Sequence, residues 1–269
     1  MVEMKVNVYD KEGKAVSKID LPKVFSEPLR EDLILRAVLA SQSNRRQPHS
    51  TSIAAGMRSS AHYHGSRRGV RWTMMGREMA RMSRLHGKIP GYLMYRARKV
   101  PQAVKGRPAH PPKVETLWAQ KINKKERKKA IRSAIAATAD KKLVEKRGHR
   151  ISSVKELPIV VDDSIEKLKK TSEVKKVLEA LGLKDELDRI SQKKVRKGKI
   201  KKRGRKYKTK IGPLIVVSKD EGVGKAVRSM RGANVSRVEN LSAEFLAPGA
   251  MAGRLAIFTK GAIEKLGKD

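Results

Sequence analysis

The sequence predicts an α/β fold: a layered α/β/α body with a mainly parallel sheet, into which a long extended basic loop is inserted. Short, wholly apolar strands alternate with stretches of helical periodicity over residues 157–267. Such strands are typical of parallel sheets that helices cover on both faces. The loop is indicated by residues 45–113, which hold 7 of the 20 Gly and 6 of the 11 Pro. Since Gly and Pro break helices and strands, we expect this stretch to lie outside the sheet.

The N-terminal part of the body is predicted to contain a hairpin and two helices. Lys5–Tyr9 and Val16–Ile19 are β-prone runs on either side of a turn that ends in Gly13. Pro28 is placed to open a helix that runs to about Ser43. After the loop, Asn123 is placed to cap a helix that continues through Ala139.

Strands and helices alternate in the C-terminal part of the body. After the strand at Leu157–Val161, a helix is expected that Ser172 caps and that Gly182 ends. Thr259 is expected to cap the final helix, which ends near Gly267. The remaining elements are strands at Leu157–Val161, Leu214–Val217, Val235–Val238 and Leu255–Phe258, and a helix near Lys225–Met230.

The composition favours a protein that binds polyanions and excludes cysteine chemistry. The 269 residues carry 64 Lys and Arg against 27 Asp and Glu, a formal net charge of +37. Such a charge attracts polyanions, with nucleic acid as the first expectation and an anionic membrane as the second. The absence of cysteine excludes disulfides, thiolate metal sites and a cysteine nucleophile. No apolar run approaches the ~20 residues that span a bilayer, and the N-terminus lacks a signal-peptide layout, so we expect a soluble intracellular protein.

The basic charge is concentrated in two stretches. Residues 45–113 carry 12 Arg and 4 Lys against one acid, Glu78, and residues 193–210 carry 9 Lys and 3 Arg and no acid. These stretches account for +15 and +12, which leaves +10 on the other 182 residues. We therefore predict a body of residues 1–44 and 114–269, an RNA-penetrating loop of residues 45–113, and a basic surface segment of residues 193–210.

The loop is predicted to become ordered on RNA. A disordered, solvated tail is the alternative, but Trp72, several Tyr and six of the ten Met give the loop more apolar content than a linker needs. Guanidinium groups pair with phosphates and stack on bases, whereas the lysines of residues 193–210 act as point charges on phosphate. A solvated run or a nuclear-localisation signal is the alternative for that second segment. The candidate RNA-binding residues are Arg45, Arg46, Arg58, Arg67, Arg68, Arg71, Trp72, Arg77, Arg81, Arg84, Arg96, Arg98, Lys105, Arg107, His110, Lys113, Lys201, Lys202, Arg203, Arg205 and Lys206.

Two motifs of the body resemble ligand sites, and a structural role is favoured for both. Asp162-Asp163 follows a strand, where it would suit Mg²⁺, but Asp163 or Ser164 capping the next helix is the favoured interpretation. Gly222-Val223-Gly224-Lys225 resembles a phosphate loop, but it lacks the spacing and the trailing Ser or Thr of one. A tight turn is favoured there.

The loop itself contains no catalytic set. His62 and His64 are two residues apart, which is a poor chelate on a helix though a possible one on a strand. With no cysteine and a single carboxylate nearby, we expect no metal site. Met75, Met79 and Met82 have the spacing of one face of a short helix, which packing explains without a cofactor. We therefore expect neither cofactor nor enzymatic activity.

Several ordered motifs resemble the universal large-subunit ribosomal protein four family in its archaeal–eukaryotic form. The resemblance covers nearly the whole chain. The motifs are AGMRSSAHYHGSRRGV (55–70), VPQAVKGRPAHPPK (100–113), KINKKERKKAIRSAIAAT (121–138), RGHRISSVKELPIVVDD (147–163), GPLIVV (212–217) and LAPGAMAGRLAIFTKGAIEKL (246–266).

The resemblance implies a structural constituent of the cytoplasmic large ribosomal subunit. Its partners would be ribosomal RNA, neighbouring ribosomal proteins and, near the loop tip, the nascent peptide, with no membrane. The loop tip would help to line the peptide exit tunnel, and the protein would act in subunit assembly. The tip falls at Gly65, Ser66, Arg67, Arg68, Gly69 and Val70, and the returning arm is matched by Gly106, Arg107, Pro111, Lys113 and Trp118.

Two other classes of protein remain as alternatives. A nucleic-acid-processing enzyme would use the basic stretches to hold its substrate and would need a carboxylate or metal cluster in the body, for which Asp162-Asp163 is the one candidate. A free-standing regulator would bind RNA or DNA away from ribosomes.

Overall fold

The computed structural model describes residues 5–267, which fall into two compact units. The first unit, the body, comprises residues 1–45 and 119–269. The second, the inserted segment, comprises residues 46–118 and contains nearly all of the predicted loop. No helix of the described residues is long and apolar enough to cross a membrane.

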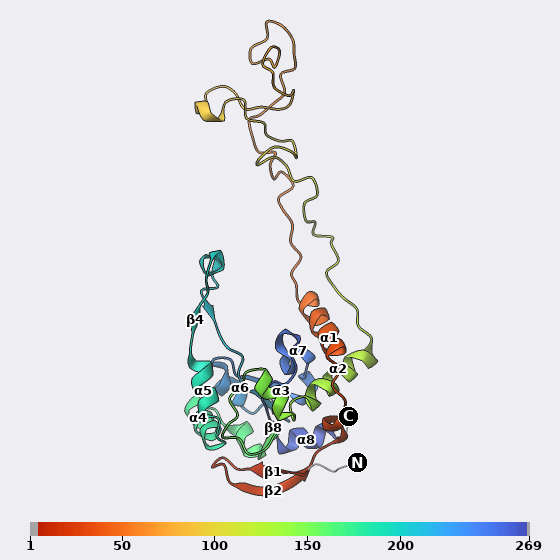
Figure 1. Cartoon of the computed structure of the whole chain (residues 1–269), viewed down its shortest axis with the longest axis vertical. Helices are drawn as coiled ribbons and strands as arrows, with labels where there is room; N and C mark the ends of the chain where they lie inside the picture. Colours follow the sequence, from red (N-terminus) through yellow and green to blue (C-terminus); the bar gives the residue numbers. More distant parts are fainter. Residues whose placement is uncertain (1–4, 268–269) are drawn as a thin grey trace. The chain divides into compact units, whose positions relative to one another are not determined.

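A six-stranded sheet forms the centre of the body, with the strand order β2-β1-β3-β8-β6-β7. Figure 1 shows the edge strand β2 beside β1. β1 and β2 pair antiparallel as the predicted hairpin, and all other neighbours are parallel. The prediction of a mainly parallel sheet is therefore confirmed. The strands are β1 (Lys5–Tyr9), β2 (Ala15–Asp20), β3 (Ile159–Val161), β6 (Leu214–Val217), β7 (Asn234–Arg237) and β8 (Ala256–Thr259).

Alternate residues of the central strands point into two separate hydrophobic cores. Val160, Val216 and Phe258 belong to one core, while their neighbours Val161 and Ile257 belong to the other. All of these side chains are buried, because helices cover both faces of the sheet. The first core is closed by α1 (Glu31–Asn44), α2 (Lys124–Ala136), α7 (Ala243–Leu246) and α8 (Lys260–Leu266), and the second by α3 (Lys141–Lys146), α4 (Thr171–Ala180), α5 (Lys184–Ser191) and α6 (Val223–Arg228). These layers confirm the predicted α/β/α architecture.

The predicted start of the first helix is wrong by one turn. Helix α1 begins at Glu31 rather than at Pro28. Ser133 of α2 holds the preceding residues outside the helix, since its Oγ donates to the Pro28 carbonyl at 3.0 Å and accepts from the Arg30 amide at 2.7 Å. A contact between residues more than 100 positions apart thus sets this boundary.

Two predicted caps also differ from the structure. Asn123 occupies the N-cap position of α2, but its side chain makes no capping hydrogen bond. Helix α4 begins at Thr171, so Ser172 lies inside the helix and caps nothing. The cap of the final helix is confirmed, because Thr259 Oγ1 accepts from the Ala262 amide at 3.3 Å.

Asp162 and Asp163 both accept hydrogen bonds from backbone amides, but the residue that caps the next helix is not one of those predicted. A one-turn 3-10 helix, Asp163–Lys167, follows β3, and Asp162 rather than Asp163 or Ser164 caps it by accepting from the Ser164 amide at 3.3 Å. Asp163 instead accepts from the Gly261 amide at 2.8 Å, in the first turn of α8. The structural interpretation of this pair is therefore correct, with the roles redistributed.

A buried carboxylate, that of Glu166, lies at the edge of the sheet where the C-terminal ends of β3, β8 and β6 meet. In open α/β sheets, this edge commonly forms the crevice that holds a ligand. Here Glu166, only 4% exposed, accepts from the Ser218 amide at 2.7 Å, the Lys219 amide at 3.1 Å and Thr259 Oγ1 at 2.8 Å. The protein thus satisfies these donors with its own side chain.

At the opposite side of the sheet, a buried guanidinium joins the loops that flank β6, β7 and β8. Arg254, 1% exposed, donates to the carbonyls of Gly212 and Gly232 at 2.9 and 3.2 Å, and to that of Phe245 at 2.8 Å. Burial, and secondarily the charge of Arg147, lower the pKa of Arg254 to about 10. Arg254 therefore acts as a structural cation that backbone carbonyls solvate.

We predict that Glu166→Ala lowers the free energy of unfolding of the body by about 2–3 kcal/mol. The buried Thr259 hydroxyl and the partly buried amide of Ser218 lose their acceptor, and a buried unsatisfied polar group costs about 1–3 kcal/mol. Urea denaturation followed by circular dichroism measures the change. Glu173→Ala on α4 is the matched control, because its exposed ion pair with Lys170 contributes less than about 1 kcal/mol; equal losses in both variants would contradict this role for Glu166.

Candidate nucleic-acid interface

The inserted segment is held by turns rather than by a hydrophobic core. Its one helical turn is Gly91–Leu93, and among residues 46–118 only Ala61 and Met74 have buried apolar side chains. Isolated β-bridges pair Arg84 with His62 and with Ala97. This is far less apolar burial than a unit of this size needs for stability of its own.

The predicted methionine helix is absent. Residues 75–82 form turns and bends, in which Gly76 and Glu78 have φ angles of +70° and +51°. These values lie in the left-handed region, so they interrupt a right-handed helix. The spacing of Met75, Met79 and Met82 therefore does not correspond to a helix face.

Several residues of the segment hold backbone conformations that L-amino acids rarely adopt. Trp72, Glu78, Tyr95, Lys99 and Lys105 have φ angles between +51° and +68°. A left-handed conformation costs a residue with a Cβ roughly 1–2 kcal/mol. Since the segment has almost no core to offset that cost, its conformation depends on contacts beyond its own packing.

The cationic side chains of the segment fall into two groups. Most are exposed, and some of these lie over aromatic rings: Arg46 is 3.7 Å from the centroid of Trp118, and Arg77 is 4.3 Å from that of Tyr95. The exposed candidates are Arg45, Arg46, Arg58, Arg67, Arg68, Arg71, Arg77, Arg81, Arg96, Lys105, Arg107, His110 and Lys113. Trp72, Arg84 and Arg98 are partly buried.

Arg84 and Arg98 have internal roles that the sequence did not indicate. The Arg84 guanidinium donates to the Ala80 carbonyl at 2.8 Å and to the Tyr95 carbonyl at 2.7 Å, and Arg98 donates to the Val104 carbonyl. Such bonds order the segment and leave fewer donors for a ligand.

Acidic side chains do not neutralise this segment. Among the described residues, the one ion pair that involves residues 45–113 joins Arg45 to Glu244 of the body, at 2.7 Å. The other charges of the segment have no carboxylate partner within 4.0 Å in the part of the chain that the structure describes. Residues 45–113 therefore carry nearly all of their +15 charge without compensation by carboxylates.

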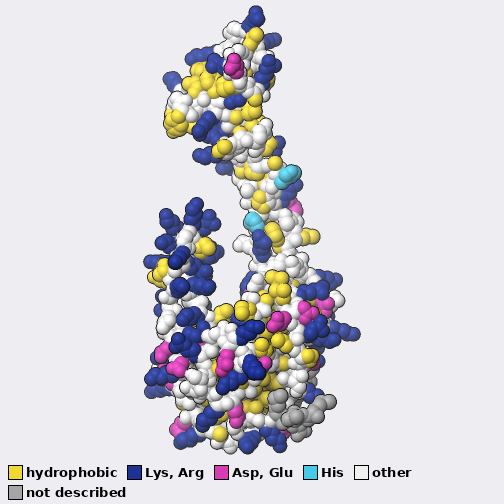
Figure 2. Space-filling model, in the orientation of Figure 1, with side chains coloured by type: hydrophobic (Ala, Val, Ile, Leu, Met, Phe, Trp, Pro, Cys, Tyr) yellow, Lys and Arg dark blue, Asp and Glu magenta, His cyan; other side chains and the backbone are white. Residues whose placement is uncertain are grey.

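The second basic stretch forms a small hairpin. β4 (Lys194–Val195) pairs antiparallel with β5 (Tyr207–Lys208), and all residues from 197 to 211 are exposed. This basic hairpin includes Lys201, Lys202, Arg203, Arg205 and Lys206. The ammonium groups of Lys193 and Lys206 lie 4.6 and 5.5 Å from the Tyr207 ring centroid. Figure 2 shows Lys and Arg side chains over most of the visible surface of the basic hairpin.

The glycine-rich sequence 222–225 is the start of a helix rather than the predicted tight turn, since Gly222 is the N-cap residue of α6 and Val223 its first residue. Asp220 Oδ1 accepts from the Gly222 amide at 3.1 Å and from the Gly224 amide at 3.0 Å. Phosphate loops use such amides to hold the ligand, and here an aspartate already occupies them. A Cβ on Gly224 would lie 2.3 Å from Asp220 Oδ2, so close packing explains this glycine.

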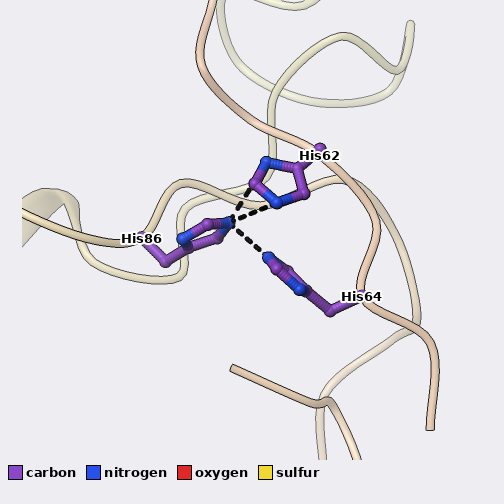
Figure 3. Close-up of side chains that lie close together, drawn as sticks. All are labelled: His62, His64 and His86. Atoms are coloured by element: carbon purple, nitrogen blue, oxygen red, sulfur yellow. Dashed lines mark hydrogen bonds between the residues drawn. The ribbon is translucent and has the colours of Figure 1, made fainter. Parts of the chain in front are cut away.

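One cluster of the segment was not foreseen. His86 lies beside His62 and His64, and candidate ligand nitrogens of the three residues are all within 4.8 Å of one another (Figure 3). The sequence places only His62 and His64 close to each other, and this pair alone gave no reason to expect a metal site. His86 is 22 residues from His64, and no periodic element links them, so sequence spacing gave no signal of the third histidine.

Comparison with known proteins gives a single family. Residues 19–269 match the family described as "Ribosomal protein L4/L1 family". The chain is 47% identical over 264 residues to the "Large ribosomal subunit protein uL4" of Methanosphaera stadtmanae, covering 98% of this chain and 96% of the relative. It is 48% identical over 265 residues to the protein of the same name from Nanoarchaeum equitans, covering 98% and 97%, and 46% identical over 261 residues to that of Methanococcoides burtonii, covering 97% and 96%.

We predict that Arg84→Gln increases hydrogen exchange in residues 80–97 about tenfold. Loss of hydrogen bonds from a charged donor to two carbonyls corresponds to about 1.4 kcal/mol of opening free energy. Exchange followed by mass spectrometry measures this change in the full chain. Arg81→Gln removes the same charge from an exposed neighbour, and it should leave exchange unchanged; a similar increase in both variants would assign the effect to charge alone.

Proposed function

Because the chain belongs to the ribosomal protein L4/L1 family, we propose that it binds ribosomal RNA in the large subunit through the inserted segment and the basic hairpin. The family is structural, and the chain is a non-enzymatic ribosomal protein of the cytoplasm. The observation that carries the RNA-binding proposal is the uncompensated charge of residues 45–113, in which the described residues give one ion pair.

RNA supplies what the inserted segment lacks. Phosphates provide counter-charge, and stacked bases provide flat surfaces for guanidinium groups and aromatic rings. The exposed arginines, the left-handed residues and the scarcity of buried apolar side chains all favour a conformation that a surrounding polyanion stabilises. The coverage of 96–97% of the archaeal relatives named uL4 supports the same assignment.

The basic hairpin is proposed to contact phosphates without reading bases. Its exposed side chains are mostly lysines, which bind phosphate as point charges. The body anchors both basic elements, and its carboxyl edge, occupied by Glu166, offers no competing ligand crevice there.

The turn at residues 65–70 is proposed to be the tip that faces the peptide exit tunnel. Gly65 and Gly69 lie in turns and have φ angles of +70° and +74°, which glycine adopts at no steric cost. Arg67, Arg68 and Val70 are exposed there. This position also matches the tip that the family resemblance implies. Incorporation during subunit assembly follows as part of the same proposal, since RNA must fold around the segment.

We predict that replacing five exposed arginines by Gln weakens the salt dependence of binding to ribosomal RNA. The replaced residues are Arg58, Arg67, Arg68, Arg71 and Arg81. Each neutralised phosphate contributes about 0.7–0.9 to the slope of log K against log salt concentration, so the slope should fall by up to about 4. Filter binding at several salt concentrations measures it.

A variant with five exposed body lysines replaced by Gln is the matched control. Suitable residues are Lys155, Lys170, Lys175, Lys176 and Lys184. The control should keep the slope of the unmodified chain; an equal fall in both variants would show that total charge, and not the inserted segment, determines binding.

A photo-cross-linker at Val70 should react with a stalled nascent peptide in large subunits that contain this protein. The tip proposal places this side chain beside the peptide path. The same cross-linker at Lys201 of the basic hairpin should give no peptide adduct. If a cross-linker at Val70 gives no peptide adduct but one elsewhere in the inserted segment does, a different part of the segment lines the tunnel.

A further inference from the structure

The three histidines converge from two distant parts of the inserted segment. His86 Nε2 lies 3.2 Å from both ring nitrogens of His62 and in direct contact with His64 Nε2. The ring centroids are 4.1 to 4.3 Å apart in all three pairs. Figure 3 shows one nitrogen of His86 pointing toward the rings of both His62 and His64.

The hydrogen bonds of the cluster leave its centre short of protons. His62 Nδ1 lies 3.1 Å from the Ser60 carbonyl, which can only accept, so this nitrogen carries the proton and Nε2 holds a lone pair. His86 Nε2 faces both His62 Nε2 and His64 Nε2. Since one proton on His86 Nε2 bridges only one of them, at least one pair of nitrogens meets without a proton, and a cation at the centre would accept all three lone pairs.

Neighbouring contacts fix the ligands before any ion binds. The indole of Trp72 stacks on His86, with centroids 5.5 Å apart and the planes inclined by 21°. The Arg84 amide donates to the His62 carbonyl at 3.2 Å. The bond from His62 Nδ1 to a backbone carbonyl is the kind of outer contact that orients histidine ligands in metal sites.

The cluster lies near the surface of the segment. His62 is exposed, and His64 and His86 are half-buried. An ion bound there would therefore stay accessible to solvent.

We propose that His62, His64 and His86 form a site for a divalent first-row transition metal ion, with Zn²⁺ as the best fit. Zinc binds imidazole nitrogen at about 2.0–2.1 Å, which places two nitrogens of a tetrahedral site about 3.4 Å apart. The observed 3.2 Å between His86 Nε2 and His62 Nε2 is close to this spacing. Three protein ligands leave a fourth position that water takes in the free chain.

The site would stabilise a unit that has almost no core. A bound ion would join His86 to His62 and His64, which lie 24 and 22 positions earlier in the chain. Small units without a core commonly depend on a metal for order. Glu78 and Glu115 are the acids of residues 46–118, and neither belongs to the cluster, so the three histidines are the ligands that come together there. Mg²⁺ and Ca²⁺ prefer oxygen ligands and should not compete.

The test titrates the metal-free full chain with Zn²⁺ by calorimetry, and with Co²⁺ by visible absorption. We expect one ion per chain, the spectrum of a tetrahedral Co²⁺ centre, and no displacement by excess Mg²⁺. His64→Ala and His86→Ala should each weaken Zn²⁺ binding by about 100-fold or more, since loss of an outer-shell partner alone costs 10–100-fold. No saturable binding, or a stoichiometry that does not depend on these residues, would overturn the proposal.

His49→Ala and His110→Ala are the matched controls. They remove histidines of the same basic loop that lie outside the cluster, and they should leave Zn²⁺ affinity unchanged; equal losses in these variants would show nonspecific binding and reject the site. X-ray absorption of the zinc-loaded unmodified chain gives a readout that needs no variant. Three imidazoles in the first shell would support the site, and a shell of oxygen alone would overturn it.

Discussion

Uncompensated positive charge is the constraint on which the structure depends. Residues 45–113 carry one acid among sixteen Lys and Arg, and the ion pair of Arg45 with Glu244 joins only the first of these cations to the body. A protein normally offsets such repulsion with carboxylates or with a hydrophobic core. The inserted segment has neither, since Ala61 and Met74 are its buried apolar side chains among the described residues. The partner that stabilises it must therefore bring negative charge, and it must reach most of the segment's length.

The body has the opposite character, because its two buried charges at the ends of the sheet are satisfied from within. Glu166 accepts hydrogen bonds from residues at the ends of β6 and β8, and Arg254 is solvated by backbone carbonyls. The edge that holds a ligand in many α/β proteins is thus part of the core. This explains how a fold common among enzymes serves here as a rigid support for two basic elements.

The sequence predicted those parts of the fold that local patterns determine. Strand β6 has the predicted bounds because Leu214–Val217 is a short apolar run between polar neighbours. The start of α1 was wrong because Ser133, far away in sequence, holds Arg30 outside the helix. Helix α5 was not predicted, since Leu187 and Ile190 are too few apolar residues to reveal a periodic face in a polar stretch.

In the candidate interface, too, the sequence predicted only the features that local composition determines. Charge density located the basic stretches, because a count of residues needs no knowledge of contacts. It could not separate the exposed Arg81 from Arg84, whose guanidinium is engaged by the Ala80 and Tyr95 carbonyls. Nor could it join His86 to His62, since turns with left-handed residues such as Trp72 and Glu78 bring them together. No simple sequence period describes such turns.

The most direct test of the central claim is a cryo-electron microscopy map of the large subunit that contains this protein. The measurement is the identity of the nearest anion to each exposed guanidinium of the inserted segment. Our account predicts that phosphates or bases of ribosomal RNA lie within hydrogen-bond or stacking distance of most of them, including Arg58, Arg68 and Arg107. A map in which carboxylates of neighbouring proteins pair with these arginines would contradict it.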